Sequence, residues 1–424
     1  MRRTVLFALT AVWLGLTSSA CIPVPIPIYP ARQPLGTALD SQGRMHVLYH
    51  DGSGYRHGII QGFLISSEVV DSDVECDSAF PGYEGRMAFD VDPAGNPHLA
   101  CPTSEGLAHI WKEAGSWNSE MVDFFENSSL MTRSSLAIDT TGAIHIGYPV
   151  MVMEQTEMEI RYAVKRNGAW TLEVADSRDT SDLGGWWWYP GAVPFPIAEI
   201  SLTPDGNPVI ASTNGGNPWY YGGAWEALNK DGVVRVAERT PEGTWDAEEI
   251  FYEEEYDDMS FGINVYDLSL AISPSGEKAV AFILGESMGV RRGSYNAYYI
   301  MKDDGSGWEV ALFSAQDCGF GRDCLWDYSS QDIDYDAANR LHVFFSREHW
   351  EDIYQLSKYT TCSLARHTES GWQETTVWDP TLWPYTWGEI DSPSCPFLHM
   401  GGSPDVRVVY SDSGQMQYMG FSSL

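Results

Sequence analysis

The side chains best suited to chemistry in this chain are tryptophans and tyrosines that crowd into segments between regular repeats. Such rings stack on sugars or anchor a protein partner when they stand in exposed loops. The candidate ligand-binding residues are Trp186, Trp187, Trp188, Tyr189, Trp219, Tyr220, Tyr221, Arg291, Trp350, Trp383 and Trp387. The same rings could instead fill small cores inside the loops, because Trp is rarely wholly exposed, and both interpretations stay open.

Carboxylates in the same segments could hydrolyse a glycoside, since that reaction needs two of them facing each other across the scissile bond. Glu226, Glu348 and Asp352 are suitable residues, but no spacing fixes the separation of any pair. The sequence carries no motif for a nucleophile and its base, so no residue is assigned a catalytic role.

Four histidines recur at one position of the repeat, namely His46, His98, His145 and His342. Residues that recur in this way are spread around a ring and cannot converge on one ion, so each is expected to make the same local hydrogen bond. The sequence also lacks a close Cys-x-x-Cys or Cys-x-x-His pair. Neither a metal site nor a cofactor is therefore predicted.

The repeat that must position these residues is clearest at 135–148, where two alternating apolar segments flank Asp139-Thr140-Thr141-Gly142. Alternation predicts strands, and the Asp-x-x-Gly step predicts a tight hairpin turn between them. The turn recurs at Gly43, Gly95, Gly142, Gly206, Gly276, Asn339 and, weakly, Pro404.

A second turn follows in the same order and carries Gly shortly before Trp, as at Gly168 and Trp170. Each unit therefore has four strands, A to D, and the Trp is expected to lie between strands C and D. The repeats predict an all-β protein: a single seven-bladed β-propeller over residues 35–424, with four antiparallel strands per blade.

The segment Asp303-Asp304-Gly305-Ser306-Gly307-Trp308 resembles the Asp-box of sialidase-type propellers, Ser-x-Asp-x-Gly-x-x-Trp, with Met301 in place of the Ser. The broader repeat is similar to secreted bacterial propellers of the BNR group. This resemblance implies the propeller fold. The arginine cluster, tyrosine nucleophile and acid that a sialidase needs have no matching motif in the sequence.

Closure of the ring needs a fourth strand for the last blade, because the sequence ends after its strand C. Residues 21–34 are rich in proline, and Pro23, Pro25 and Pro27 alternate with aliphatic residues. We expect this segment to be an extended tether. The alternative is a closing edge strand whose prolines face away from the neighbouring strand.

Residues 1–20 have the features of a secretory signal peptide, since Arg2 and Arg3 precede an apolar run and small residues precede Cys21. Cys21 resembles the lipidated cysteine of bacterial lipoproteins, although Ser18 stands where that motif usually has Leu. The resemblance implies an exported protein anchored to the membrane at Cys21, at the outer membrane in a Gram-negative host.

Lipidation of Cys21 leaves six of the seven cysteines, an even number that can pair. Their positions in the repeat favour the disulfides Cys76–Cys101, Cys318–Cys324 and Cys362–Cys395. These are one of the 15 sets of pairings that six cysteines allow.

The acidic balance limits the range of partners. The chain has 25 Lys and Arg against 59 Asp and Glu, a net charge of −34, which repels phosphate backbones and argues against nucleic acid.

The connections from strand D to the next strand A, and from B to C, are long, while the other two turns are short, so one face is built up. We expect a monomeric, non-catalytic propeller that binds a glycan or protein ligand on that face. The alternatives are a glycan-processing enzyme on the same face and a scaffold subunit of a cell-envelope complex.

Overall fold

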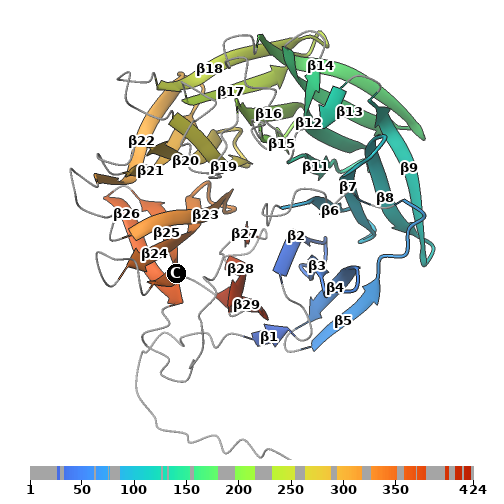
Figure 1. The fold of residues 1–424 in the computed structure, drawn as a ribbon, viewed down its shortest axis with the longest axis horizontal. Coiled ribbons are helices and arrows are strands. Elements are labelled where there is room, and N and C mark those ends of the chain that lie inside the picture. The colour runs from blue at the N-terminus through green and yellow to red at the C-terminus, as the bar shows by residue number, and fades with distance from the viewer. Residues whose placement is uncertain are drawn as a thin grey trace, which may run out of the picture.

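The computed structural model describes residues 26–28, 33–61, 64–74, 76, 86–125, 128–130, 133–152, 157–179, 196–214, 232–253, 263–287, 294–317, 326–350, 358–368, 370–378, 397–400, 406–412 and 415–421. They form an all-β propeller of antiparallel four-stranded blades, as predicted, with the sheets arranged around a common centre (Figure 1). No helix in this part of the chain is long and apolar enough to cross a membrane.

The strands in the described ranges form seven sheets, each of which runs from an inner strand A to an outer strand D. The first contains β2 (Gln33–Leu39), β3 (Met45–His50), β4 (Tyr55–Gln61) and β5 (Leu64–Val69). The second contains β6 (Ala88–Val91), β7 (Pro97–Thr103), β8 (Gly106–Glu113) and β9 (Ser116–Phe124). In the third, the short strands β10 (Ser128–Leu130) and β11 (Ser135–Ile138) both pair with β12 (Ile144–Val152), followed by β13 (Glu157–Arg166) and β14 (Ala169–Asp179). The fourth contains β15 (Ala198–Leu202), β16 (Pro208–Thr213), β17 (Gly232–Arg239) and β18 (Trp245–Glu253).

The fifth sheet contains β19 (Ile263–Ile272), β20 (Lys278–Ser287), β21 (Ser294–Asp303) and β22 (Trp308–Asp317). The sixth contains β23 (Trp326–Tyr335), β24 (Leu341–Trp350), β25 (Lys358–Thr368) and β26 (Gly371–Trp378). The last contains β27 (Phe397–Met400), β28 (Val406–Asp412), β29 (Gln415–Phe421) and, outermost, β1 (Ile26–Ile28).

The proline-rich segment supplies the closing strand, so our expectation of a tether was wrong for residues 26–28. Strand β1 pairs with β29 in antiparallel register, from Ile26 opposite Tyr418 to Ile28 opposite Met416. Both ends of the chain therefore build one sheet, where blue and red meet in Figure 1. Pro23, Pro25 and Pro27 suit an edge strand only if their nitrogen atoms, which carry no hydrogen, face away from the partner strand. Pro27 lies in the middle of this pairing.

The inner strands close a ring in chain order. Neighbouring inner strands contact each other from β2 through β6, β11, β15, β19 and β23 to β27, and β27 contacts β2 again. At this last junction the hydroxyl of Thr37 and Nε2 of His399 are hydrogen-bonded at 2.5 Å. Seven clusters of buried apolar side chains fill the spaces within and between the sheets in the described residues.

The hairpin turns between strands A and B lie where the sequence predicts them. Gly43, Gly95, Gly142, Gly206 and Gly276 all have positive φ, and Asn339 takes the same left-handed conformation at +58°. The preceding aspartate often stabilises the turn with its side chain, as Asp139 does by accepting the N–H of Thr141 and of Ala143. Pro404 lies outside the described residues.

The strands run further than the alternation in the sequence indicated, and the loops between them are correspondingly shorter. One of the connections between strands B and C, which the sequence predicts to be long, has only four residues, because β12 continues to Val152 and β13 begins at Glu157. Likewise β24 continues to Trp350, which pairs with Lys358. Polar residues near the strand ends hid this continuation.

The tryptophans of the second turn bridge neighbouring blades, which differs from our expectation that they lie between strands C and D of one blade. The indole N–H of Trp170 in β14 donates to Glu120 in β9 of the preceding blade at 3.0 Å. Trp245 donates in the same way to Glu173 at 2.8 Å. Trp170 and Trp245 thus fasten their outer strands to the ones before them, whereas the indole N–H of Trp117 has no acceptor in the described residues.

The recurring histidines share one position beside an aspartate, but the predicted hydrogen bond is made by His46 and His342 only. Nε2 of His98 and of His145 has no hydrogen-bond partner within the described residues. The Nε2 atoms of His46, His98, His145 and His342 lie 3.3, 3.7, 3.5 and 3.2 Å from an aspartate carboxylate in the preceding turn. All four rings are buried. They hold the A–B turn against strand B, which is a structural function.

The disulfide Cys76–Cys101 is present as predicted and ties the connection before β6 to β7. Cys362 is also disulfide-bonded. Its expected partner Cys395, and the predicted pair Cys318–Cys324, lie outside the described residues.

Candidate functional site

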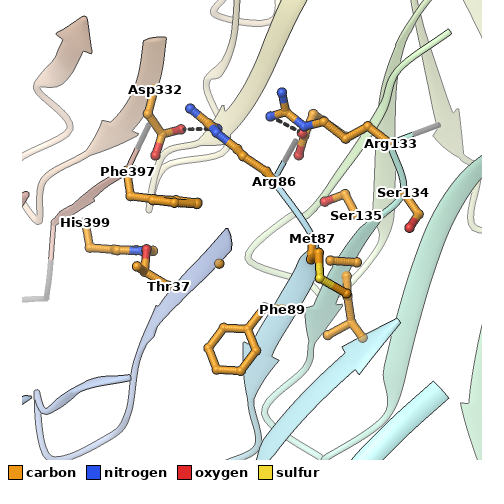
Figure 2. Close-up of a pocket in the computed structure, with 14 residues that line it drawn as sticks. Thr37, Arg86, Met87, Phe89, Arg133, Ser134, Ser135, Asp332, Phe397 and His399 are labelled. Carbon is orange, nitrogen blue, oxygen red and sulfur yellow. Dashed lines mark hydrogen bonds and ion pairs between the residues drawn. The ribbon is translucent and has the colours of Figure 1, made fainter. Parts of the chain in front are cut away.

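A cavity of about 130 Å³ lies on the propeller axis, at the end of the inner strands where the strand D to strand A connections lead in. The cavity wall comes from β2, β6, β15, β23 and β27 and from the residues directly before and in β11. Side chains from six blades therefore meet at one place, which Figure 2 shows.

Arg133 forms the centre of one wall, two residues before β11. Its guanidinium group donates to Asp267 at 2.6 Å and to the carbonyl oxygen of Leu268 at 3.0 Å, and it pairs with Glu199 at 2.5 Å. The side chain is only 10% exposed. Burial opposes the charge, but Glu199 and Asp267 outweigh this effect and raise the pKa of Arg133, which keeps it cationic.

Nε of Arg133 is a buried donor without a hydrogen-bond acceptor in the described residues. A buried N–H without an acceptor is destabilising, because folding removes the water that would satisfy it. The atom belongs to a side chain on the cavity wall, so an oxygen atom of a bound molecule is a suitable acceptor.

Asp267 is held in an unusual backbone conformation behind Arg133. Its φ is +62°, a left-handed value that costs energy for residues other than glycine, and it lies at an irregularity in the pairing of β19 with β20. The side chain uses both oxygens, one for Arg133 and the other for the N–H of Gln331 at 2.7 Å. Backbone strain of this kind gathers at functional sites, which supports a role for this wall.

Arg86 also lines the cavity, two residues before β6, and points toward Asp332 (Figure 2). It donates to Asp332 and to Ser269, both at 3.1 Å, and also to the carbonyl oxygen of Gln331. Its guanidinium group lies over the ring of Phe397, 5.2 Å from the centroid. Asp332 in turn accepts the backbone N–H of Leu398 at 2.8 Å, which fixes the pair between two blades.

His399 and Thr37 complete the polar wall beside Phe397. Burial lowers the pKa of His399, so the ring is neutral at neutral pH and can donate or accept one hydrogen bond at each nitrogen. The carboxyl group of Glu199 has a pKa shifted in the other direction: burial raises it, even though Arg133 opposes the change.

Two further carboxyl groups lie deeper on the inner strands, and burial raises the pKa of each to about 7. Asp90 accepts the N–H of Ile138 in the next inner strand at 2.9 Å, and Asp334 accepts that of Met400 at 2.8 Å. Their hydrogen bonds join neighbouring blades around the axis. These two residues stabilise the ring beneath the cavity and do not line it.

The arrangement is chemically a small polar binding site with apolar edges, since Phe89, Met87 and Leu136 share the wall with the ion pairs. Such a mixture of apolar surface with a few fixed donors and acceptors is typical of small-molecule sites. No group of three or more His, Cys, Asp or Glu within the described ranges could hold a metal ion. The site offers hydrogen bonds and charge to a ligand.

The residues that the sequence singled out for ligand binding are not in this cavity. Those outside the described residues are Trp186, Trp187, Trp188, Tyr189, Trp219, Tyr220, Tyr221, Arg291, Trp383 and Trp387, and so is the lipidation candidate Cys21. Trp350 is the last residue of β24, of which the structure describes the backbone there.

Sequence reasoning missed the axial residues because they do not recur between repeats. A usable signal existed: Arg86 and Arg133 each stand two residues before an inner strand, where other repeats have apolar or small residues. Glu199 and Asp332 likewise interrupt inner strands. Once the strand order is known, charged residues at positions that the propeller fold places near its axis indicate a site.

Comparisons with known proteins bear on the fold. No family model matches the chain, and no curated protein matches it either. Among solved structures, an ulvan lyase of polysaccharide lyase family PL25, bound to -[GlcA(1-4)Rha3S]-, is 12% identical with a TM-score of 0.55, over 95% of this chain and 94% of that chain. A second PL25 ulvan lyase structure has 12% identity, a TM-score of 0.54 and the same coverage. At this identity the similarity shows that the fold is shared and nothing more.

Proposed function

We propose that this protein is a seven-bladed β-propeller that binds a glycan, without catalysis, in the axial cavity. The proposal is carried by the cavity itself, in which Arg86 and Arg133 lie among carboxylates, hydroxyls and aromatic edges from several blades. Sugars present many hydroxyl groups and apolar ring faces, and this combination of fixed donors, acceptors and apolar edges suits them.

The position of the cavity supports the proposal. Ligands of repeat proteins usually bind where insertions build up one face, and the cavity lies at the end of the inner strands to which the longer connections lead. The aromatic residues that the sequence predicted for binding belong to those connections. Polysaccharide lyases that share the fold provide an analogy for a glycan ligand.

A glycan-processing enzyme is a second candidate, and Glu199 favours it. A carboxyl group whose pKa is raised by burial can keep a proton for a leaving group, and Glu199 lies on the cavity wall. We rank this candidate second because Arg133 already holds Glu199 at 2.5 Å. No observation on the described residues favours the scaffold subunit.

The binding proposal is tested with a glycan array probed by a soluble form that lacks residues 1–21. We expect binding to at least one glycan, and we expect Arg86→Met and Ser135→Ala to weaken it in protein that circular dichroism shows to be folded. Arg407→Met is the matched control, since Arg407 donates to Gly43 in a turn at the opposite end of the blades. An array without binding, or equal binding by all variants, contradicts the proposal.

We also propose that the protein is exported and anchored to the envelope through lipidated Cys21. Support comes from the signal-like residues 1–20 and from the even number of cysteines that remains. Metabolic labelling with a radioactive fatty acid should mark the wild-type chain and not Cys21→Ala. Labelling of both chains, or of neither, contradicts the anchor.

A further inference from the structure

Both cations around the axial cavity are already paired with carboxylates within the described residues. Two cations, Arg86 and Arg133, face three carboxylates, Glu199, Asp267 and Asp332. The local charge is therefore −1 when all five are ionised, and zero when one carboxyl group holds a proton. No positive charge remains for an anionic ligand.

An anionic sugar would meet this surface at a cost. A carboxylate or sulfate entering the cavity would come near Asp332 and Glu199 as well as near their arginine partners, and full pairing with either guanidinium group would disturb an existing ion pair. Like charges a few ångströms apart in a partly buried site repel each other, because little water lies between them to screen the field. The net charge of −34 on the whole chain adds to this repulsion.

An uncharged hydroxyl group has the opposite property, because it both donates and accepts. One hydroxyl can accept from a guanidinium N–H while it donates to the carboxylate beside it, and neither ion pair has to break. Two neighbouring hydroxyls of a sugar match an arginine–carboxylate pair in this way. Arg86 with Asp332 and Arg133 with Glu199 are two such pairs among the residues that line the cavity, and Nε of Arg133 still needs an acceptor.

We infer that the axial cavity selects an uncharged sugar and rejects the same sugar bearing a carboxylate or sulfate group. The volume of about 130 Å³ is too small for a chain of sugars, so the cavity takes one end or one edge of the ligand. This inference rests on the proposed function and specifies its ligand class.

The test compares matched ligands that differ in charge alone. Titration calorimetry with the soluble form uses oligogalacturonides before and after full methyl esterification, and any acidic glycan from the array before and after carboxyl reduction. We expect the neutral member of each binding pair to bind at least about tenfold more tightly, since tenfold corresponds to about 1.4 kcal/mol. Tighter binding of the acidic member overturns the inference.

A charge variant sharpens the test. Glu199→Gln removes one carboxylate from the wall and should reduce the preference for the neutral member about tenfold, because the two arginines are then matched by only two carboxylates. Glu309→Gln is the matched control, since it removes the same charge from an exposed position on β22, and it should leave the preference unchanged. An unchanged preference in a folded Glu199→Gln overturns the inference.

The two failures are distinguishable. If acidic glycans bind best and Arg86→Met abolishes that binding, the cavity is a glycan site and only the inferred ligand class is wrong. If Arg86→Met leaves every interaction intact, the proposed site itself is wrong.

Discussion

Nδ1 of His46 lies 3.0 Å from Nε2 of His57, so two buried imidazole rings are hydrogen-bonded to each other inside the first blade. The chain of contacts continues at both ends. Nε2 of His46 lies 3.3 Å from Asp40, and Nδ1 of His57 lies 3.1 Å from Glu68. Glu68 also binds Lys112 of the next blade. A row of polar groups therefore crosses the blade from the inner turn to the outer strand.

The second blade repeats this row with His98 and His109, whose ring nitrogens are also 3.0 Å apart, and with Glu120 and Lys165 at the outer end. Burial lowers the pKa of His57, and that of His98, to about 4. These rings are neutral in the folded protein at pH 7. As the pH falls, the same histidines are protonated at a higher pH in the unfolded chain than in the folded protein.

The histidines should make the fold sensitive to acid. In the unfolded chain a histidine binds a proton below pH about 6.5, whereas folded His57 does so only below about 4. Its contribution is complete above pH 6.5 and is lost as the pH falls toward 4. The shift corresponds to roughly 3 kcal/mol at 1.36 kcal/mol per pKa unit. We expect the difference in unfolding free energy between wild type and His57→Gln to shrink by about this amount from pH 7.5 to 4.5 in urea denaturation.

His50 provides the control for this experiment. It is exposed at the end of β3 in the same blade, so His50→Gln shows the effect of replacing an exposed histidine by glutamine under the same conditions. A pH-independent difference for His57→Gln would contradict the account of the buried row. The comparison between variants is needed because Asp90 and Asp334, with raised pKa values, act in the opposite direction: the stability they provide is lost as the pH rises through 7.

The bridging tryptophans should stabilise the contact between blades in proportion to their burial. Trp170→Phe removes a partly buried hydrogen bond to the charged Glu120, which is expected to cost about 1–2 kcal/mol. Trp308→Phe removes the equivalent bond to exposed Glu248 and should cost about 0.5 kcal/mol or less. Urea denaturation measures both. Equal losses, or a larger loss at Trp308, would contradict the bridging role.

The Cys76–Cys101 disulfide closes a loop with a sequence separation of 25. Its loss should lower the unfolding free energy by about 3 kcal/mol, because the unfolded chain gains entropy. The measurement compares wild type with the double variant Cys76→Ser and Cys101→Ser under oxidising conditions. Under reducing conditions the two proteins should become equally stable. If mass spectrometry shows that the wild-type disulfide is reduced and its unfolding free energy is nevertheless unchanged, this contribution is refuted.

The closing strand gives a further prediction about the fold. A chain lacking residues 1–29 loses β1, so β29 loses its outer partner and the last blade keeps three strands. We expect its melting temperature to fall by at least about 2 °C relative to a chain that lacks only residues 1–21. Equal melting temperatures for the two truncated chains would mean that β1 contributes nothing to closure.

The architecture could be predicted from the sequence because the same local pattern of turns and alternating strands recurs along the chain. The turns at Gly43, Gly95 and Gly142 need a left-handed residue, and each lies between alternating strands, so one copy confirms the next. The closing strand was harder to predict, since β1 and β29 pair across almost the whole chain and no local pattern records that contact. The axial site was hard to predict for the same reason, since Arg133 contacts Asp267 and Glu199 only because the blades close into a ring.

The most direct test of the account is a crystal structure of the soluble protein with the tightest ligand from the array. We predict that a sugar lies in the axial cavity, with hydroxyl groups within hydrogen-bonding distance of Arg86 or Arg133 and of Asp332 or Glu199. A sugar bound elsewhere on the propeller, with the axial cavity occupied by water alone, would contradict the central claim.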